Sequence, residues 1–411
     1  MNVILIKLLL ALACSGLIGV VLARRRAAEA WLEGRSAVGV IGVAWILLRI
    51  LPFIGIYLVL GYQPVSDIQG YLIRWGTSAL HGGLIYRDFE CTYSPLYPYL
   101  IAASLGLWYN MKAIALLMVV MELAALVLTF RFFRNMPEGR RLLLALLYLT
   151  TPAGLIFTVI AGQEDIWLWL FAAGACLMYR QTGKTIVLAL GIVLGLLATK
   201  AVDVLYILPF LFLVPKPFQL TAWLAGIGIV LLGTLYGLVG LEFLQPIREA
   251  ETLRAPNLLS VVNPWVFNAI HRGTGLWNWI GLAATVGGGS WVALRVRDLP
   301  FEQAFSRMWV GVYGLMMVVQ QSAYSNYLFL FLPPLLFAVV DWDNKRDIVL
   351  FLLFNILCVV HPSFWWRMGN PEYLAPADIF ASGLRTLDYA MQLSIVVLTF
   401  YWVGRAAGRK G

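Results

Sequence analysis

Long apolar runs recur along the whole of this sequence, and they decide which folds are open to it. A helix needs about 20 apolar residues to cross the core of a bilayer, and many of the runs approach that length. Hydrophobic residues make up 61% of the chain and charged residues only 12%, whereas soluble proteins average roughly 45–50% and about 25%. The composition excludes a water-soluble globule. It predicts a polytopic, all-α integral membrane protein, because an isolated strand cannot satisfy its backbone in lipid.

The apolar runs predict about 12 to 13 transmembrane helices in a single membrane domain, residues 1–411. They are 3–23, 37–61, 112–130, 142–161, 166–179, 185–199, 201–214, 219–240, 277–294, 308–322, 328–341, 348–361 and 387–404. The stretch 185–214 has an alternative, one long tilted span, which would invert every later loop. Two short spans keep more basic residues on the cytoplasmic side, so we prefer them.

The basic residues predict the orientation of the chain. With the N-terminus outside, the cytoplasmic segments are 24–36, 131–141, 180–184, 215–218, 295–307, 342–347 and 405–411, which hold 19 of the 30 Lys and Arg residues. The longer loops 62–111, 241–276 and 362–386 then lie outside. The net charge of +9 therefore implies no nucleic-acid partner. We expect a multi-pass protein of the cell (cytoplasmic) membrane with its active site on the extracytoplasmic face.

Cofactor motifs are not visible in the sequence. The four cysteines give no disulfide framework or metal-ligand spacing, and the three histidines have no His/Glu cluster beside them. There is also no phosphate-binding glycine loop of the nucleotide-binding families. We expect no cofactor and no bound metal, and the sequence leaves divalent-metal use open.

The first large outer loop, 62–111, contains the most informative acid, Asp67. Ser66 and Gln69 have the spacing of a capping box, which predicts a helix with Ser66 as its cap and Asp67 as its first residue. One face of this helix would be apolar and suited to lying at the membrane surface: Ile68, Tyr71, Leu72, Trp75 and Ala79. The helix dipole favours an ionised carboxylate there by about 0.3–1 kcal/mol. Asp67 is therefore either a base just outside the bilayer or simply an acid that starts a helix.

Several short motifs follow one another along the outer loops. They are Asp67 with Tyr71, Gly83, Tyr86-Arg87-Asp88-Phe89, Tyr93-Ser94-Pro95-Leu96, Gly162-Gln163-Glu164-Asp165 and Lys200. In their order and in hydropathy, residues 37–345 resemble the GT-C superfamily of membrane glycosyltransferases. The nearest branch is that of the bacterial polyprenyl-phosphate-mannose-dependent alpha-mannosyltransferases. The span before Val38 and the lack of a soluble C-terminal domain depart from that pattern.

The resemblance implies an enzyme with a GT-C-like active site at the outer face, in which Asp67 is the catalytic carboxylate. The implied reaction is the inverting transfer of a hexose, mannose in the nearest branch, from a polyprenyl-phosphate donor to a lipid-linked or glycan acceptor. One carboxylate suffices for this chemistry, because a lipid phosphate leaves without the protonation that an alkoxide needs. The expected partners are this donor, the acceptor and membrane lipids.

Cations are needed to hold the donor phosphate. Lys200 interrupts an apolar stretch, where a central lysine costs about 2.5–3.5 kcal/mol, so it is the first candidate. Asp203, three residues on, offers the alternative of an internal ion pair. Arg254 and Arg248 lie in the loop 241–276, which we interpret as a donor lid. Each arginine is alternatively a solvated charge or a lipid contact.

Acceptor and sugar binding is assigned to polar and aromatic residues of the outer segments. They are Gln163, Glu164, Asp165, Tyr71, Tyr86, Tyr93, Tyr327 and His361. Aromatic rings stack on sugars but more commonly anchor at headgroup depth, and acids also cap helices. Two other functions stay open, a transporter or flippase of lipid-linked sugars and a glycan polymerase. A transporter is disfavoured because no inverted repeat is visible and the acids concentrate in outer loops.

Overall fold

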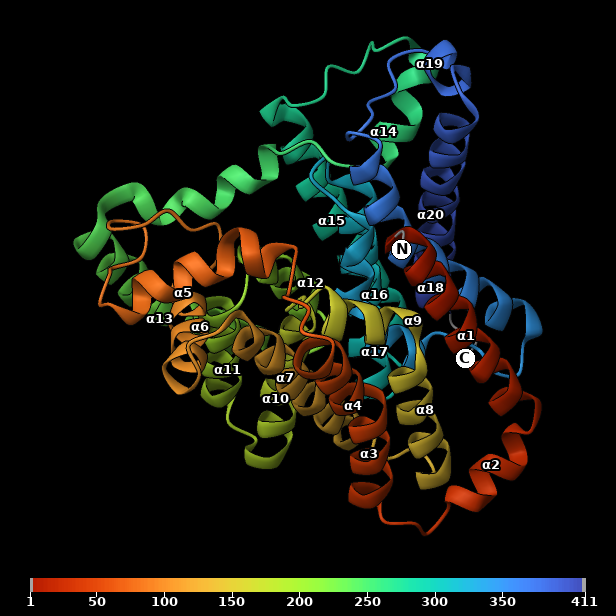
Figure 1. Ribbon diagram of the computed structural model, residues 1–411. Coiled ribbons are helices and arrows are strands. Elements are labelled where there is room, and N and C mark those ends of the chain that lie inside the picture. The colour runs from red at the N-terminus through yellow and green to blue at the C-terminus, as the bar shows by residue number, and fades with distance from the viewer. Residues whose placement is uncertain (1–2, 409–411) are drawn as a thin grey trace.

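The computed structural model describes residues 3–408 and consists of helices joined by loops (Figure 1). Over that range no β-strand forms, and one isolated bridge joins Ile85 to Phe89. The predicted all-α class is confirmed. Residues 1–2, and residues 409–411 of the predicted cytoplasmic tail, lie outside the described part.

Six helices within residues 3–408 are long and apolar enough to cross a bilayer. They are α1 (Val3–Ala23), the run of α3 (Ala37–Trp45), η1 (Ile46–Ile50), α4 (Leu51–Phe53) and η2 (Ile54–Val59), α7 (Met111–Phe132), α13 (Pro217–Val239) with η6 (Gly240–Glu251), α18 (Lys345–Arg367) and α20 (Gly383–Ala407). A seventh span results if α8 (Glu138–Thr150) and the segment Pro152–Ile160, bent by 58°, are taken as one. These apolar helices give the chain the character of a multi-pass membrane protein.

The remaining helices complete the bundle. They are α2 (Arg25–Leu32), η3 (Ile68–Leu72), α5 (Ile73–Leu80), α6 (Tyr97–Leu107), α9 (Pro152–Leu155), η4 (Ile156–Ile160), α10 (Ile166–Thr182), α11 (Thr185–Ala198), η5 (Ala201–Tyr206), α12 (Ile207–Leu211), α14 (Leu258–Val262), η7 (Asn263–Val266), α15 (Gly275–Val296), α16 (Phe301–Val319), η8 (Ser325–Tyr327), α17 (Leu328–Ala338) and α19 (Pro376–Phe380). Every predicted apolar run coincides with at least one helix, but several of these helices are short.

Local sequence signals set where the helices begin and end. The Asn110 side chain accepts a hydrogen bond from the Lys112 amide and caps α7, as Asn344 caps α18. Thr151 caps α9 and Pro152 opens it, which explains the bend after α8. Gly183 ends α10 with a φ of +66°, a conformation that costs glycine little.

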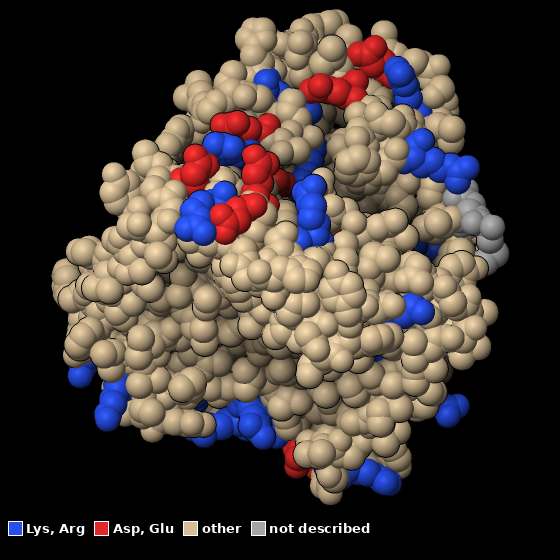
Figure 2. Space-filling view, turned by 60° about the vertical axis from the view of Figure 1, so that its left-hand side comes forward, with Lys and Arg blue, Asp and Glu red and all other residues tan. Residues whose placement is uncertain are grey.

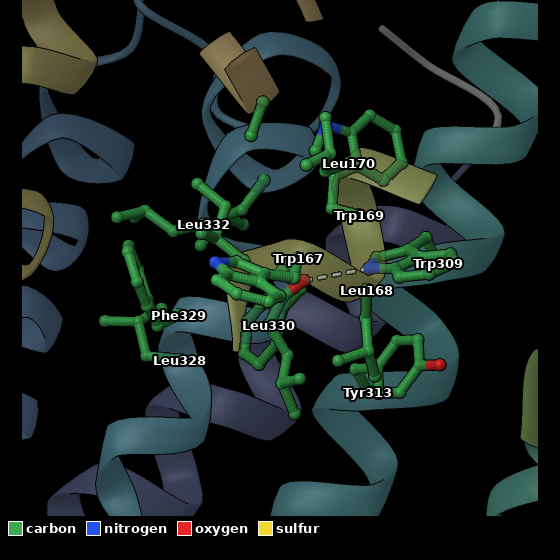
Figure 3. Close-up of a cluster of buried hydrophobic side chains, with 14 of the residues drawn as sticks. Trp167, Leu168, Trp169, Leu170, Trp309, Tyr313, Leu328, Phe329, Leu330 and Leu332 are labelled. Atoms are coloured by element: carbon green, nitrogen blue, oxygen red, sulfur yellow. Dashed lines mark hydrogen bonds between the residues drawn. The ribbon is translucent and has the colours of Figure 1, made fainter. Parts of the chain in front are cut away.

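The core of the molecule lies where α10, α16 and α17 meet (Figure 3). Trp167, Trp169 and Trp309 are fully buried there among leucines and phenylalanines of α17. The Trp309 indole donates a hydrogen bond of 2.9 Å to the backbone oxygen of Leu330, so this buried polar group is satisfied. The tightly packed core fixes the start of α10 and the turn that precedes it.

A buried ion pair joins three helices in the N-terminal half. The Arg49 guanidinium of η1 donates to both carboxylate oxygens of Glu122 in α7, at 2.7 and 2.9 Å. The Tyr148 hydroxyl of α8 donates to the same carboxylate, and neither charged side chain is exposed. Such a pair is stable only when its hydrogen bonds are complete, as they are here. The sequence analysis did not single out any of these residues.

The charged side chains are separated into two zones. In Figure 2, red and blue residues gather in the upper part of the molecule, blue residues line its lower end, and a broad uncharged band lies between them. This pattern is typical of a body that spans a bilayer. The helix α13 contributes to the band, because only Leu220 and Val239 of its residues are buried.

The first outer loop differs in part from the prediction. A helix does begin at this point, but the predicted capping box is wrong. Ser66 has a φ of +67°, whereas an N-cap residue needs an extended backbone, and the η3 terminus has no side-chain cap. The predicted face does not float at the surface either. Leu72 and Trp75 are buried where α5 packs against α6, and a Cβ on Gly76 would come within 2.5 Å of Ile101.

The stretch 185–214 contains two short helical segments, and their assignment as two separate spans stays a prediction. α11 ends at Ala198, and η5 begins at Ala201 and continues into α12. Between them, Lys200 has an extended backbone with φ −129° and ψ 152°. The break brings the lysine to the edge of the cavity described next.

Candidate functional site

A cavity of about 1500 Å³ opens between the helices and collects most of the predicted site residues. Its lining comes from segments far apart in the sequence: α1, η3 with α5, the loop 90–93, η4, η5, the loop after η6, α15, η8 and α18. Of the predicted residues, those that line it are Asp67, Tyr71, Tyr93, Gln163, Lys200, Arg254 and Tyr327. Seven of the twelve predicted site residues are thus gathered at one place.

Asp67 is held in place by a chain of two amides. One carboxylate oxygen of Asp67 accepts a hydrogen bond of 3.0 Å from the Gln163 side chain. The oxygen of that amide accepts one of 2.7 Å from Asn326 at the start of η8. Because Gln163 cannot rotate without losing both bonds, the orientation of the Asp67 carboxylate is fixed.

The surroundings of Asp67 act in both directions on its protonation. Burial, followed by the charge of Glu164, raises the pKa of the Asp67 carboxyl above its ordinary value of 3.8. The hydrogen bond from Gln163 and the charges of Lys200 and Arg254 lower that pKa. Burial opposes the helix-dipole effect that the sequence predicted, and a raised pKa suits a residue that takes up a proton.

The turn that carries Gln163 depends on Gly162. Gly162 has a φ of +59°, and a Cβ built on it would come within 2.3 Å of Ile68. A side chain there would push η3 away from the turn. The close approach of the two backbones lets the Gln163 amide reach the carboxylate of Asp67.

Lys200 is the cation of a compact ionic cluster. Its ammonium lies 2.6 Å from a carboxylate oxygen of Glu164 and 2.6 Å from one of Asp165. The Tyr93 hydroxyl donates to Glu164 at 2.7 Å, and the ammonium lies 5.0 Å from the Tyr93 ring centre. The alternative partner, Asp203, is not the one used. The Asp203 carboxylate faces the Tyr313 hydroxyl, 3.5 Å away.

The charges within the cluster support one another. Burial lowers the pKa of Lys200, but the charges of Asp165 and Glu164 raise it well above 10.5 in total, so the ammonium stays protonated. Burial raises the pKa of Asp165 to about 6 in spite of the opposing charge of Lys200. Lys200 is therefore a fixed positive charge at the cavity wall, already balanced by acids of this chain.

Two arginines line the cavity on the side of the loop after η6. Arg254 pairs with Glu249, and its backbone amide donates to the backbone oxygen of Gln321 at 3.0 Å. Arg272 donates to the backbone oxygen of Arg254 at 2.7 Å and pairs with Glu372 at 3.1 Å. These bonds anchor the predicted lid segment to the body of the protein.

Other predicted residues lie away from the cavity wall. Arg248 is exposed on η6 and does not line the cavity. Glu164 and Asp165 lie beneath the wall, fully buried under Lys200. Tyr86 is buried and donates to the backbone oxygen of Tyr93. Glu164, Asp165 and Tyr86 support the lining through these contacts, whereas Arg248 has no such contact.

His361 also lies inside the protein. Its ring contacts the Ser325 hydroxyl at 3.3 Å and the Asp388 carboxylate at 3.4 Å. Neither the His361 nor the Asp388 side chain is exposed. The neighbouring Pro362, not His361, lines the cavity. The sequence placed the histidine at an interface because it could not show that α20 covers this turn of α18.

The sequence analysis did not single out Lys7 and Arg74, two basic residues that line the cavity. Lys7 had a signal, since it is the only charged residue of the run 3–23. Arg74 had none beyond its place in the outer loop. Within residues 3–408 no group of three or more His, Cys, Asp or Glu side chains is arranged to hold a metal ion.

Comparison of the chain with protein-family models, with curated proteins and with solved structures gives no match. The function is therefore argued from the site itself.

Proposed function

We propose that the protein is a membrane glycosyltransferase that moves a hexose, mannose in the first instance, from a polyprenyl-phosphate donor to a lipid-linked or glycan acceptor. The observation that carries this proposal is the Asp67 carboxylate, which lines a large cavity and is aimed by Gln163. Cations and aromatic rings surround the same space, as sugar and phosphate binding requires. The family resemblance of the sequence motifs points to the same chemistry.

The reaction is a single displacement with inversion. The acceptor hydroxyl oxygen bonds to the anomeric carbon as the bond from that carbon to the lipid phosphate breaks. Asp67 takes the hydroxyl proton, and the phosphate leaves with the bonding electrons. No general acid is required, because the phosphate is stable as an anion at neutral pH.

Lys200 and Arg254 are the proposed contacts of the departing phosphate. Both line the cavity with Asp67, and the positive charge of each lowers the pKa of the Asp67 carboxyl. Arg254 is the better of the two predicted loop arginines, since Arg248 is outside the cavity. Tyr71, Tyr93 and Tyr327 also line the cavity and offer rings for stacking on sugars.

The proposed orientation places the cavity on the extracytoplasmic face of the cell membrane. It rests on the predicted topology of about 12 to 13 spans with the N-terminus outside. The mixed charges at one end and the basic residues at the other agree with it (Figure 2). In this arrangement the lipid donor reaches the cavity sideways from the outer leaflet.

The test is sugar transfer by the purified protein in detergent, with a radiolabelled polyprenyl-phosphate sugar and extracted membrane lipid. Asp67→Asn keeps the acceptor for the Gln163 hydrogen bond but removes the base. We expect its turnover to fall about 10²–10⁴-fold, the usual contribution of a general base. The matched control is Asp298→Asn, an exposed acid outside the cavity, which should transfer sugar normally.

Two results would reject the proposal. Normal turnover by Asp67→Asn would show that another group takes the proton. Movement of the labelled lipid between the leaflets of a vesicle, without any glycosylated product, would assign the cavity to a transporter instead.

A further inference from the structure

The first helix forms part of the cavity wall, in a region we call the α1 end. Its lining there is Val3, Ile4 and Lys7 from α1, Phe157 and Ile160 from η4, and Trp366 from α18. The helix α1 packs against α18, α9 and α8, and only Ala11 and Ile18 of its residues are buried. The α1 end is thus largely apolar, with one ammonium group in its wall.

Lys7 differs from the other half-buried cations of the cavity wall. Lys200 pairs with Glu164 and Asp165, and Arg254 and Arg272 each pair with a glutamate. In contrast, no carboxylate of residues 3–408 lies within ion-pair distance of Lys7. A lysine in an apolar membrane helix is costly, and charged residues there commonly mark a binding path. Among the described residues, Lys7 is therefore a cation without an anionic partner.

The volume of the cavity is sufficient for two substrates. A pocket for one small ligand measures roughly 300–1,000 Å³, and this cavity measures about 1500 Å³. A phosphate on the reacting carbon must lie close to the base, and the cations whose charges act on Asp67 include Lys200 and Arg254. The charges that act most on Asp67 do not include that of Lys7 in α1, so we assign a phosphate held at Lys7 to the other substrate.

We propose that Lys7 binds the phosphate of a lipid-linked acceptor, whose chain lies along α1 and η4 while its sugar reaches Asp67. The inference rests on the proposed function and adds the class of acceptor: an anionic lipid in which sugar units separate the phosphate from the accepting hydroxyl. The apolar wall suits a prenyl or acyl chain, and the ammonium supplies the charge-assisted hydrogen bonds that a phosphate needs. Donor and acceptor then occupy separate ends of one cavity.

The test counts bound lipid phosphates by native mass spectrometry of the full-length protein in detergent, with farnesyl phosphate as the probe. We expect two bound molecules in the wild type and one in Lys7→Gln, with affinity at the lost site at least about tenfold weaker, or about 1.4 kcal/mol. Lys7→Arg keeps the charge and should bind two. Lys184→Gln, a change at an exposed lysine outside the cavity, should also bind two.

Further measurements identify the chemical groups that the site binds and check that Lys7→Gln is folded. Farnesol and inorganic phosphate should each fail to fill the α1 end, since the site needs both chain and phosphate. Without ligand, Lys7→Gln should melt no lower than the wild type, because it removes an unpaired charge from an apolar helix. Two molecules bound by Lys7→Gln, equal binding of inorganic phosphate, or a lower melting temperature would each overturn the inference.

These results are separable from those of the transfer assay. Asp67→Asn should keep both bound molecules, because the base does not hold phosphate. Loss of transfer in the wild type together with two bound probes would reject the proposed function and leave the Lys7 site. Sugar transfer by a wild type that binds only one probe would support the proposed function and reject the Lys7 site.

Discussion

Replacing Lys200 with methionine tests the ionic cluster beneath the cavity. Lys200→Met keeps a side chain of similar length but removes the charge that lies between Glu164 and Asp165. Glu164 still accepts a hydrogen bond from Tyr93, whereas Asp165 loses the only side-chain partner that its carboxylate has within residues 3–408. We therefore expect the larger penalty at Asp165.

The magnitude follows from the protonation of Asp165. Its pKa of about 6 in the folded protein exceeds the ordinary 3.8, so the folded state gains less than the unfolded state from its ionisation. At pH 8 the folded protein still gains about 3 kcal/mol from that ionisation. Without Lys200, burial keeps the carboxyl protonated and this gain is lost. At pH 5 Asp165 is already protonated, so its share of the loss is close to zero.

Loss of the contact with Glu164 adds to this penalty. Removing one partner of a buried ion pair costs about 3–5 kcal/mol as a rule, and this range contains the whole expected effect at pH 8. Unfolding by SDS in mixed micelles, followed by circular dichroism at pH 8 and pH 5, measures the free energy of unfolding. We expect the stability loss of Lys200→Met to be about 3 kcal/mol smaller at pH 5 than at pH 8.

A combined variant supplies the decisive comparison. Adding Glu164→Gln and Asp165→Asn to Lys200→Met removes the uncompensated acids and should recover stability at pH 8. Lys184→Met, at an exposed lysine, serves as the control and should unfold like the wild type. An equal loss at both pH values, or a triple variant no more stable than Lys200→Met, would refute the electrostatic reasoning.

Three further predictions concern the base and the helix contacts. Gly162→Ala should lose about 1–3 kcal/mol of stability and a larger share of activity, because its Cβ meets Ile68; unchanged melting and transfer would contradict this. The acid limb of kcat/KM should lie above pH 3.8, since Asp67 is active only when deprotonated and its pKa is raised; an acid limb at or below 3.8 would count against Asp67. In Lys200→Met this acid limb should move to higher pH, because the charge of Lys200 lowers the pKa of Asp67. Glu122→Gln should cost about 3–5 kcal/mol in thermal or SDS unfolding by stranding Arg49, and joint replacement of both by leucine should recover most of it.

Much of the helical architecture follows from the sequence, because an apolar segment in lipid satisfies its own backbone hydrogen bonds only as a helix. The position of Lys200 between two helices was also predictable, since a lysine inside an apolar stretch needs a polar destination. Its partners were not predictable. The nearest acid in sequence, Asp203, is passed over for Glu164 and Asp165, which belong to another turn.

Contacts between distant segments explain the other differences. Gln163 and Asp67 are 96 residues apart, so their hydrogen bond has no local pattern that announces it. The same is true of Arg49 and Glu122, which each look like an isolated charge in an apolar helix. The burial of His361 depends on α20, which begins at Gly383, 22 residues later in the chain. Sequence periodicity reports one helix at a time, and these features arise between helices.

The two-amide chain that holds Asp67 has a consequence for the integrity of the polypeptide. Asp67 and Gln163 come before the predicted cytoplasmic loop 215–218, and Asn326 comes after it. A protease cut in that loop would leave the carboxylate on one fragment and the outer amide on the other. Only re-association of the two fragments would restore both hydrogen bonds that orient the carboxylate. Neither fragment could therefore carry a working base alone.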